Sequence, residues 1–83
     1  MAVSKTNKFV LIYTVFDKET RKALYAGYTS KVQVDQAVQA IIDKKGSRLE
    51  NYTLDQLLIN VQQAVPIEDA VQVRATLRSQ LKV

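Results

Sequence analysis

The side chains of this sequence that could do chemistry are tyrosines and one unusually placed arginine. Four tyrosines, Tyr13, Tyr25, Tyr28 and Tyr52, are the candidate functional aromatic residues, and Arg74 lies near the end of the chain. Tyrosines of strands also serve as ordinary core or surface residues. A guanidinium presents a planar fork of hydrogen-bond donors that matches a phosphate group. The arginine therefore points toward a phosphate-bearing partner.

The composition excludes several kinds of catalysis. The chain has no cysteine and no histidine, which excludes thiol nucleophiles, disulfide frameworks, zinc fingers and Ser-His-Asp triads. Catalysis would need carboxylates, lysine, tyrosine or a metal held by oxygen ligands. The 83 residues leave room for one domain, and a content of 47% hydrophobic and 24% charged residues is typical of a globular protein.

The charge balance permits a polyanionic partner without demanding one. Twelve Lys and Arg residues against eight Asp and Glu give a net charge of +4. The basic residues are scattered, with no run longer than Lys44-Lys45, which also fits a solvated surface of mixed charge. The apolar run Phe9 to Phe16 is too short to cross a membrane, and charged residues follow it where a signal peptide has a cleavage site. We expect a soluble, cytoplasmic protein with no membrane partner.

The tyrosines lie in a predicted β-hairpin. Residues 1–7 are polar and are expected to be a disordered end, followed by a single domain over residues 8–83. Residues 9–16 are rich in β-branched and aromatic side chains and almost continuously apolar, which predicts a central strand buried on both faces. After a polar turn, residues 23–29 predict a second, antiparallel strand.

An amphipathic helix is predicted over residues 31–45. Apolar residues between 34 and 41 recur at helical spacing and form one stripe. The hydroxyl of Thr29 or Ser30 can cap the start of the helix, and Gly46 can adopt a left-handed conformation at its end.

The segment 53–64 fits two structures. Thr53 and Gln56 have the spacing of a capping box before residues with helical periodicity. The residues from Ile59 to Gln63 also alternate as a strand does, and Pro66 ends the segment. The pattern alone does not decide between a helix and a strand.

A final helix is predicted from residue 66. Pro66 suits its first turn, and its apolar stripe includes Ala70, Leu77 and Leu81. Position 74 belongs to that stripe but holds Arg74. An arginine among inward-facing residues needs a physical reason.

The hairpin resembles that of the GIY-YIG nuclease family. Members have a strand that ends in Gly-Ile-Tyr, a short turn, and a second strand that ends in Tyr-Ile-Gly before a helix. Here Leu11-Ile12-Tyr13 and Tyr25-Ala26-Gly27 have that arrangement. The match covers about residues 8–82 and implies an α+β fold of β-β-α-β-α order, with its third strand at about 56–63. A β-hairpin followed by three helices is the alternative fold.

The resemblance also implies that catalysis is lost. Family enzymes use the first tyrosine, an arginine on the first helix and a glutamate on the last helix that holds a divalent metal. Here Asp35 or Gln36 stands where that arginine is expected, and Arg74 stands where the glutamate is expected. Glu68 or Asp69 could hold a metal instead, but each lies about a helical turn or more away, at a helix start where carboxylates commonly serve the helix dipole. We therefore expect no enzyme activity, no metal and no cofactor.

These patterns predict a non-catalytic module that binds DNA or RNA through a basic, tyrosine-lined groove. A small regulatory or inhibitory protein that binds another protein is the alternative, and Arg74 could instead pair with Asp35 or Glu68. A helix-turn-helix over residues 53–81 is disfavoured because its turn is too long and lacks the usual glycine. The oligomeric state is left open. The expected nucleic-acid-binding residues are Tyr13, Tyr25, Gly27, Tyr28, Lys31, Lys44, Lys45, Arg48 and Arg74.

Overall fold

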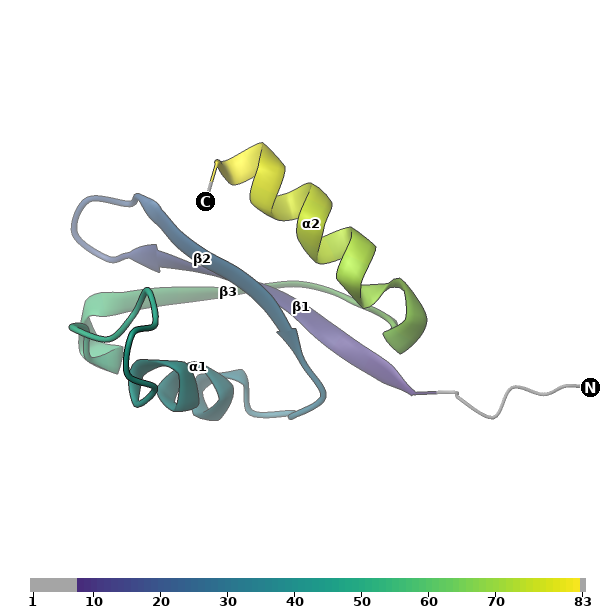
Figure 1. Ribbon diagram of the computed structural model, residues 1–83, viewed down its shortest axis with the longest axis horizontal. Helices are drawn as coiled ribbons and strands as arrows, with labels where there is room; N and C mark the ends of the chain where they lie inside the picture. The colour runs from purple at the N-terminus through teal and green to yellow at the C-terminus, as the bar shows by residue number, and fades with distance from the viewer. Residues whose placement is uncertain (1–7, 83) are drawn as a thin grey trace, which may run out of the picture.

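The fold is a three-stranded antiparallel sheet with one helix on each face (Figure 1). A computed structural model describes residues 8–82, so the predicted disordered end at residues 1–7 lies outside the described residues. The strand order is β2-β1-β3, with β1 in the centre. The elements are β1 (Phe9–Asp17), β2 (Ala23–Thr29), α1 (Val34–Ile42), the 3-10 turn η1 (Leu54–Gln56), β3 (Leu57–Pro66), the 3-10 turn η2 (Ile67–Asp69) and α2 (Ala70–Leu81). The α+β class and the β-β-α-β-α order are confirmed, and the three-helix alternative is wrong.

Strand β1 is central because both of its faces are apolar. Val10 and Ile12 pack toward α2, whereas Tyr13 and Val15 pack toward α1, and all four side chains are buried. A strand covered on both faces needs an almost continuous apolar run rather than alternating polar residues. The predicted central strand is confirmed.

The sheet divides the protein into two hydrophobic cores. The α1 core contains Val34 and Val38 of the predicted helical stripe. It also contains Leu49, which lies in the loop after α1 and is fully buried. The α2 core is smaller and centres on Ile12 and Ala70, with Val73 packed against it. Sequence periodicity did not predict Leu49 as a core residue, because a loop has no regular spacing.

The helix α1 is shorter than predicted at both ends. It begins at Val34, and neither Thr29 nor Ser30 caps it. The Thr29 hydroxyl instead accepts a hydrogen bond from the Lys31 N–H at 3.0 Å, which turns the chain before the helix starts. Gly46 has the predicted left-handed backbone, with φ of 84°, but the helix has already ended at Ile42.

Both patterns in the segment 53–64 are present, one after the other. Thr53 and Gln56 form the capping box of η1, and the Thr53 N–H donates to the Gln56 side-chain oxygen at 3.0 Å. The chain then becomes β3, which pairs with β1 from Leu57 to Pro66. Residues 57–66 form a strand rather than a helix because β1 needs a hydrogen-bonded partner along its second edge. In residues 8–82, no helix is both long and apolar enough to cross a membrane.

We expect Leu49→Ala to lower the free energy of unfolding by about 2–5 kcal/mol, as for a core leucine, because the side chain is fully buried beneath the loop. Its exposed neighbour gives a matched control, and Glu50→Ala should change the free energy by no more than about 0.5 kcal/mol. Urea unfolding followed by circular dichroism measures both. A loss below about 1 kcal/mol in Leu49→Ala would contradict an anchoring role for this loop.

Candidate functional site

The sheet separates the candidate site residues into two groups. Tyr13, Tyr25 and Gly27 lie on the α1 face. Tyr28 packs on the α2 face, where the guanidinium of Arg74 lies over its ring. Side chains that follow one another along a strand point to opposite faces. The expected groove, lined by residues of both groups, is therefore not formed.

The α1 group is a packed tyrosine pair over a glycine. The ring centroids of Tyr13 and Tyr25 lie 6.2 Å apart, and Gly27 lies opposite Tyr13 across the two strands. A Cβ atom at Gly27 would lie 2.7 Å from Cε2 of Tyr25, closer than real contacts allow. A side chain at position 27 would therefore require the Tyr25 ring that covers it to shift. Tyr13 is only 2% exposed, so Tyr13 and Gly27 offer no surface to nucleic acid.

The burial of Tyr13 favours its neutral form. Burial raises the pKa of Tyr13 most, and the neighbouring Tyr25 adds to the rise through its charge and a side-chain hydrogen bond. A phenol held neutral in the folded state acts as a core side chain with a polar end.

We expect Gly27→Ala to lower the free energy of unfolding by about 1–3 kcal/mol, because the new methyl group displaces the Tyr25 ring. In a Tyr25→Ala background the same change should cost less than about 0.5 kcal/mol, since the colliding ring is gone. Gly46→Ala is the control, because Gly46 has a left-handed backbone and open space around it. Its cost, about 1 kcal/mol, should not depend on Tyr25. Additive costs in the Gly27–Tyr25 cycle would contradict the proposed contact.

We also expect alkaline pH to destabilise the protein through Tyr13. The folded-state pKa of Tyr13 lies above the unfolded value of about 10. Its contribution to stability is therefore fully present below about pH 10 and is lost as the pH rises toward the folded pKa. In the Tyr13→Phe variant, the free energy of unfolding should therefore fall less as the pH rises. The Tyr52→Phe variant retains Tyr13 and should show the same fall as the wild type. Urea unfolding between about pH 8 and 11 measures the difference, and parallel curves for wild type and Tyr13→Phe would refute it.

The α2 group explains the arginine in the apolar stripe. The Arg74 guanidinium carbon lies 5.4 Å from the centroid of the Tyr28 ring, a cation–π contact. Among residues 8–82, no ion pair with Asp35 or Glu68 holds this guanidinium, and its buried Nε has no hydrogen-bond partner. The side chain is half-buried. An aromatic face thus accepts a cation in a position where the periodicity predicts an apolar residue.

One side of α2 is basic. Arg78 lies one helical turn beyond Arg74, and Lys82 follows at the end of the helix. Helix α2 has no acidic residue between Ala70 and Leu81. We call Tyr28, Arg74, Arg78 and Lys82 the basic face. The sequence prediction missed Arg78 and Lys82 as partners of Arg74, although their spacing of four residues was readable in the sequence.

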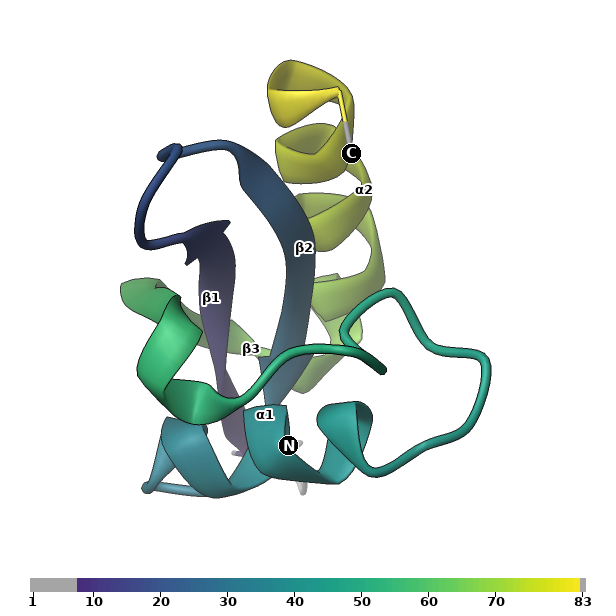
Figure 2. The same cartoon turned by 90° about the vertical axis from the view of Figure 1, so that its left-hand side faces the viewer.

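The remaining basic candidates lie elsewhere. Lys44, Lys45 and Arg48 are exposed in the loop after α1; helix α1 covers the opposite face of the sheet from α2, and this loop projects outward beyond the strands (Figures 1 and 2). Lys31 is exposed in the turn between β2 and α1. The structure therefore does not bring the basic candidates into a single patch.

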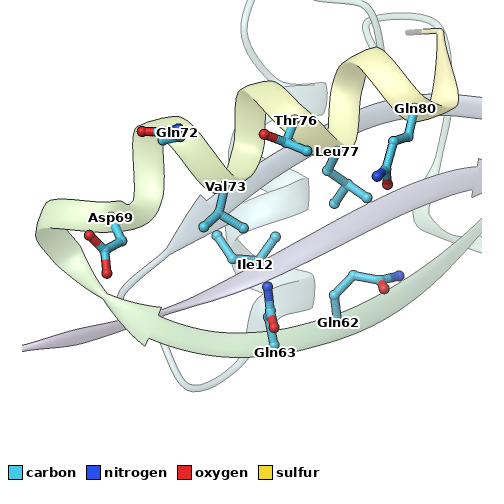
Figure 3. A pocket seen from close by; sticks show the side chains of 9 residues that line it. All are labelled: Ile12, Gln62, Gln63, Asp69, Gln72, Val73, Thr76, Leu77 and Gln80. Carbon is cyan, nitrogen blue, oxygen red and sulfur yellow. The ribbon is translucent and has the colours of Figure 1, made fainter.

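A groove of about 620 Å³ lies between α2 and β3, and its lining is mostly uncharged (Figure 3). Ile12, Val73 and Leu77 provide its apolar lining, and amide and hydroxyl side chains provide the rest. Asp69 is its charged member. None of the candidate site residues lines it. The polar lining residues are Gln62, Gln63, Asp69, Gln72, Thr76 and Gln80.

Within residues 8–82, no three acidic side chains come together as a metal-ligand set. Comparisons with protein-family models, curated proteins and solved structures find no significant match to this chain.

Proposed function

We propose that this protein is a small non-catalytic module that binds nucleic acid through the basic face of α2. The observation that carries the proposal is the Arg74 guanidinium, which lies on the Tyr28 ring without a carboxylate to neutralise it. A cation held in place by an aromatic ring loses little conformational freedom when it binds a phosphate. Charge and preorganisation both support a phosphate as its partner.

The rest of the basic face supports phosphate contacts that do not depend on sequence. Arg78 and Lys82 continue the line of charge along α2, and no carboxylate of the helix competes for them. Three such cations predict a slope of about −3 for the logarithm of the binding constant against the logarithm of the salt concentration on duplex DNA. The resemblance to a nuclease scaffold fits this proposal, with an arginine holding a phosphate where the family has a metal-binding glutamate.

A role in binding another protein is the second candidate. Exposed apolar side chains favour it: Phe9, Val32 and Val71 are 59%, 88% and 57% exposed. They lie on different elements: Phe9 at the start of β1, Val32 in the turn after β2, and Val71 on the outer side of α2. The dispersed positions support several small contacts better than one apolar interface.

We expect labelled duplex DNA, branched DNA and single-stranded RNA to bind with affinity that falls steeply between about 50 and 200 mM salt. Arg74→Gln and Arg78→Gln should each weaken binding about tenfold and reduce the salt slope by about 1. Lys44→Gln/Lys45→Gln, in the loop after α1 and outside the basic face, should bind as the wild type does. Fluorescence anisotropy with Mg²⁺ present measures binding, and the same samples on a gel reveal any cleavage.

Circular dichroism confirms that each variant is folded. No binding at low salt, or equal affinity of the arginine variants and the wild type, would overturn the proposed surface. Cleavage of the label would overturn the non-catalytic proposal.

A further inference from the structure

Strand β3 leaves a long, uncharged edge of the sheet unpaired. Among the described residues it pairs with β1 alone, and all ten residues from Leu57 to Pro66 are uncharged. Six of them are exposed, including Val61 at 47%. Edge strands usually avoid further pairing through charge or short length, and a long neutral edge is a template for another strand.

Acidic residues stand at both ends of this edge. Asp17 lies opposite Leu57 in the register, and the next residue, Lys18, donates its N–H to the Gln56 carbonyl. A hollow of about 460 Å³ at this end is lined by three carboxylates and one lysine. Two more carboxylates follow Pro66 in η2. Asp55, Glu68 and Asp69 thus flank β3 along the chain, and Asp17 at the end of β1 and Glu19 in the following turn line the hollow beside its first residues.

The groove beside β3 suits a polypeptide. A register shift between Ile12 and Tyr13 of β1 leaves Gln62 as an extra residue of β3, and both Gln62 and Gln63 line the groove (Figure 3). Across the groove, α2 contributes Gln72 and Gln80. Amide side chains donate and accept hydrogen bonds without charge, as a peptide backbone does.

The opposite edge of the same molecule has the complementary pattern. The seven residues of β2, Ala23–Thr29, are uncharged, and β2 pairs with β1 alone among the described strands. Arg21 and Lys22 precede β2, and Lys31 follows it. Lys22 and Lys31 are nine residues apart, as are Leu57 and Pro66. The ten residues of β3 span about 30 Å and the seven residues of β2 about 20 Å, so the long lysine side chains just beyond the ends of β2 can reach the acidic ends of β3.

We propose that a second copy of this chain docks its β2 edge against β3 and continues the sheet. The contact is heterologous, because β2 of one copy pairs with β3 of the other. Each copy then keeps one free edge, so further copies can add in a row. Antiparallel pairing of β3 with itself would bring acidic ends together, and pairing of β2 with itself would bring basic ends together. Charge thus selects the β2–β3 pairing. The inference is independent of nucleic-acid binding.

Sedimentation velocity of the wild-type protein at low salt, between about 5 and 500 μM, should show dimers and longer species, which dissociate at about 0.5 M salt. Lys22→Glu/Lys31→Glu alters one edge, and Glu68→Lys/Asp69→Lys alters the other. Each variant alone should be monomeric. An equimolar mixture should regain association and form heterodimers, because the first variant keeps its native β3 edge and the second keeps its native β2 edge.

Lys44→Glu/Lys45→Glu is the matched control and should assemble as the wild type does. Val61→Lys, in the middle of β3, should also abolish assembly without changing either end of the edge. Far-UV circular dichroism and thermal unfolding confirm that each variant is folded, which matters for the Glu68 and Asp69 changes at the start of α2.

Three results would overturn the proposal. The first is a wild-type protein that stays monomeric at about 500 μM. The second is self-association of Lys22→Glu/Lys31→Glu as strong as that of the wild type, which would point to pairing of β3 with itself. The third is a mixture of the two variants that forms no heterodimer.

Discussion

The burial of β1 on both faces is the constraint on which the rest of the structure depends. A strand whose side chains are apolar on both faces is stable only where both faces are covered from solvent. It requires strands along both edges and a covering layer on each face, and β2, β3, α1 and α2 supply these four. In a chain of 83 residues, little remains beyond these elements and the loop that Leu49 anchors.

The same strand keeps the two faces of the protein apart. Residues that are neighbours in the sequence, such as Ile12 and Tyr13, belong to different cores because successive side chains of a strand point to opposite faces of the sheet. The α1 face is a closed core in which two tyrosines pack over a glycine. The α2 face is more open, because α2 packs mainly over β2 and leaves the β3 side as a groove. The side chains of the α2 face are therefore more accessible to a binding partner than those of the α1 face.

Helix α2 gives that face two different sides. Toward β2 it carries Arg74 and Arg78, and the aromatic ring of Tyr28 accepts the first of them. Toward β3 it carries glutamines and a threonine along the groove. The charged residues are sorted in a related way, with carboxylates at the ends of β3 and basic residues at the ends of β2. One small domain thus presents a cationic surface and a neutral, acid-flanked edge in different directions.

Local patterns in the sequence determined the hairpin, the central place of β1, the apolar stripe of α1 and the capping box at Thr53. These features depend on residues close together in the chain, so spacing is enough to reveal them. The strand conformation of residues 57–66 and the contact between Arg74 and Tyr28 depend on partners 40 or more residues away in the chain. The burial of Leu49 depends on a loop that has no periodicity. The same holds for the candidate site residues. The sequence identified Tyr13, Tyr28 and Arg74 as candidates, but only the sheet placed Tyr13 on the opposite face from Tyr28 and Arg74.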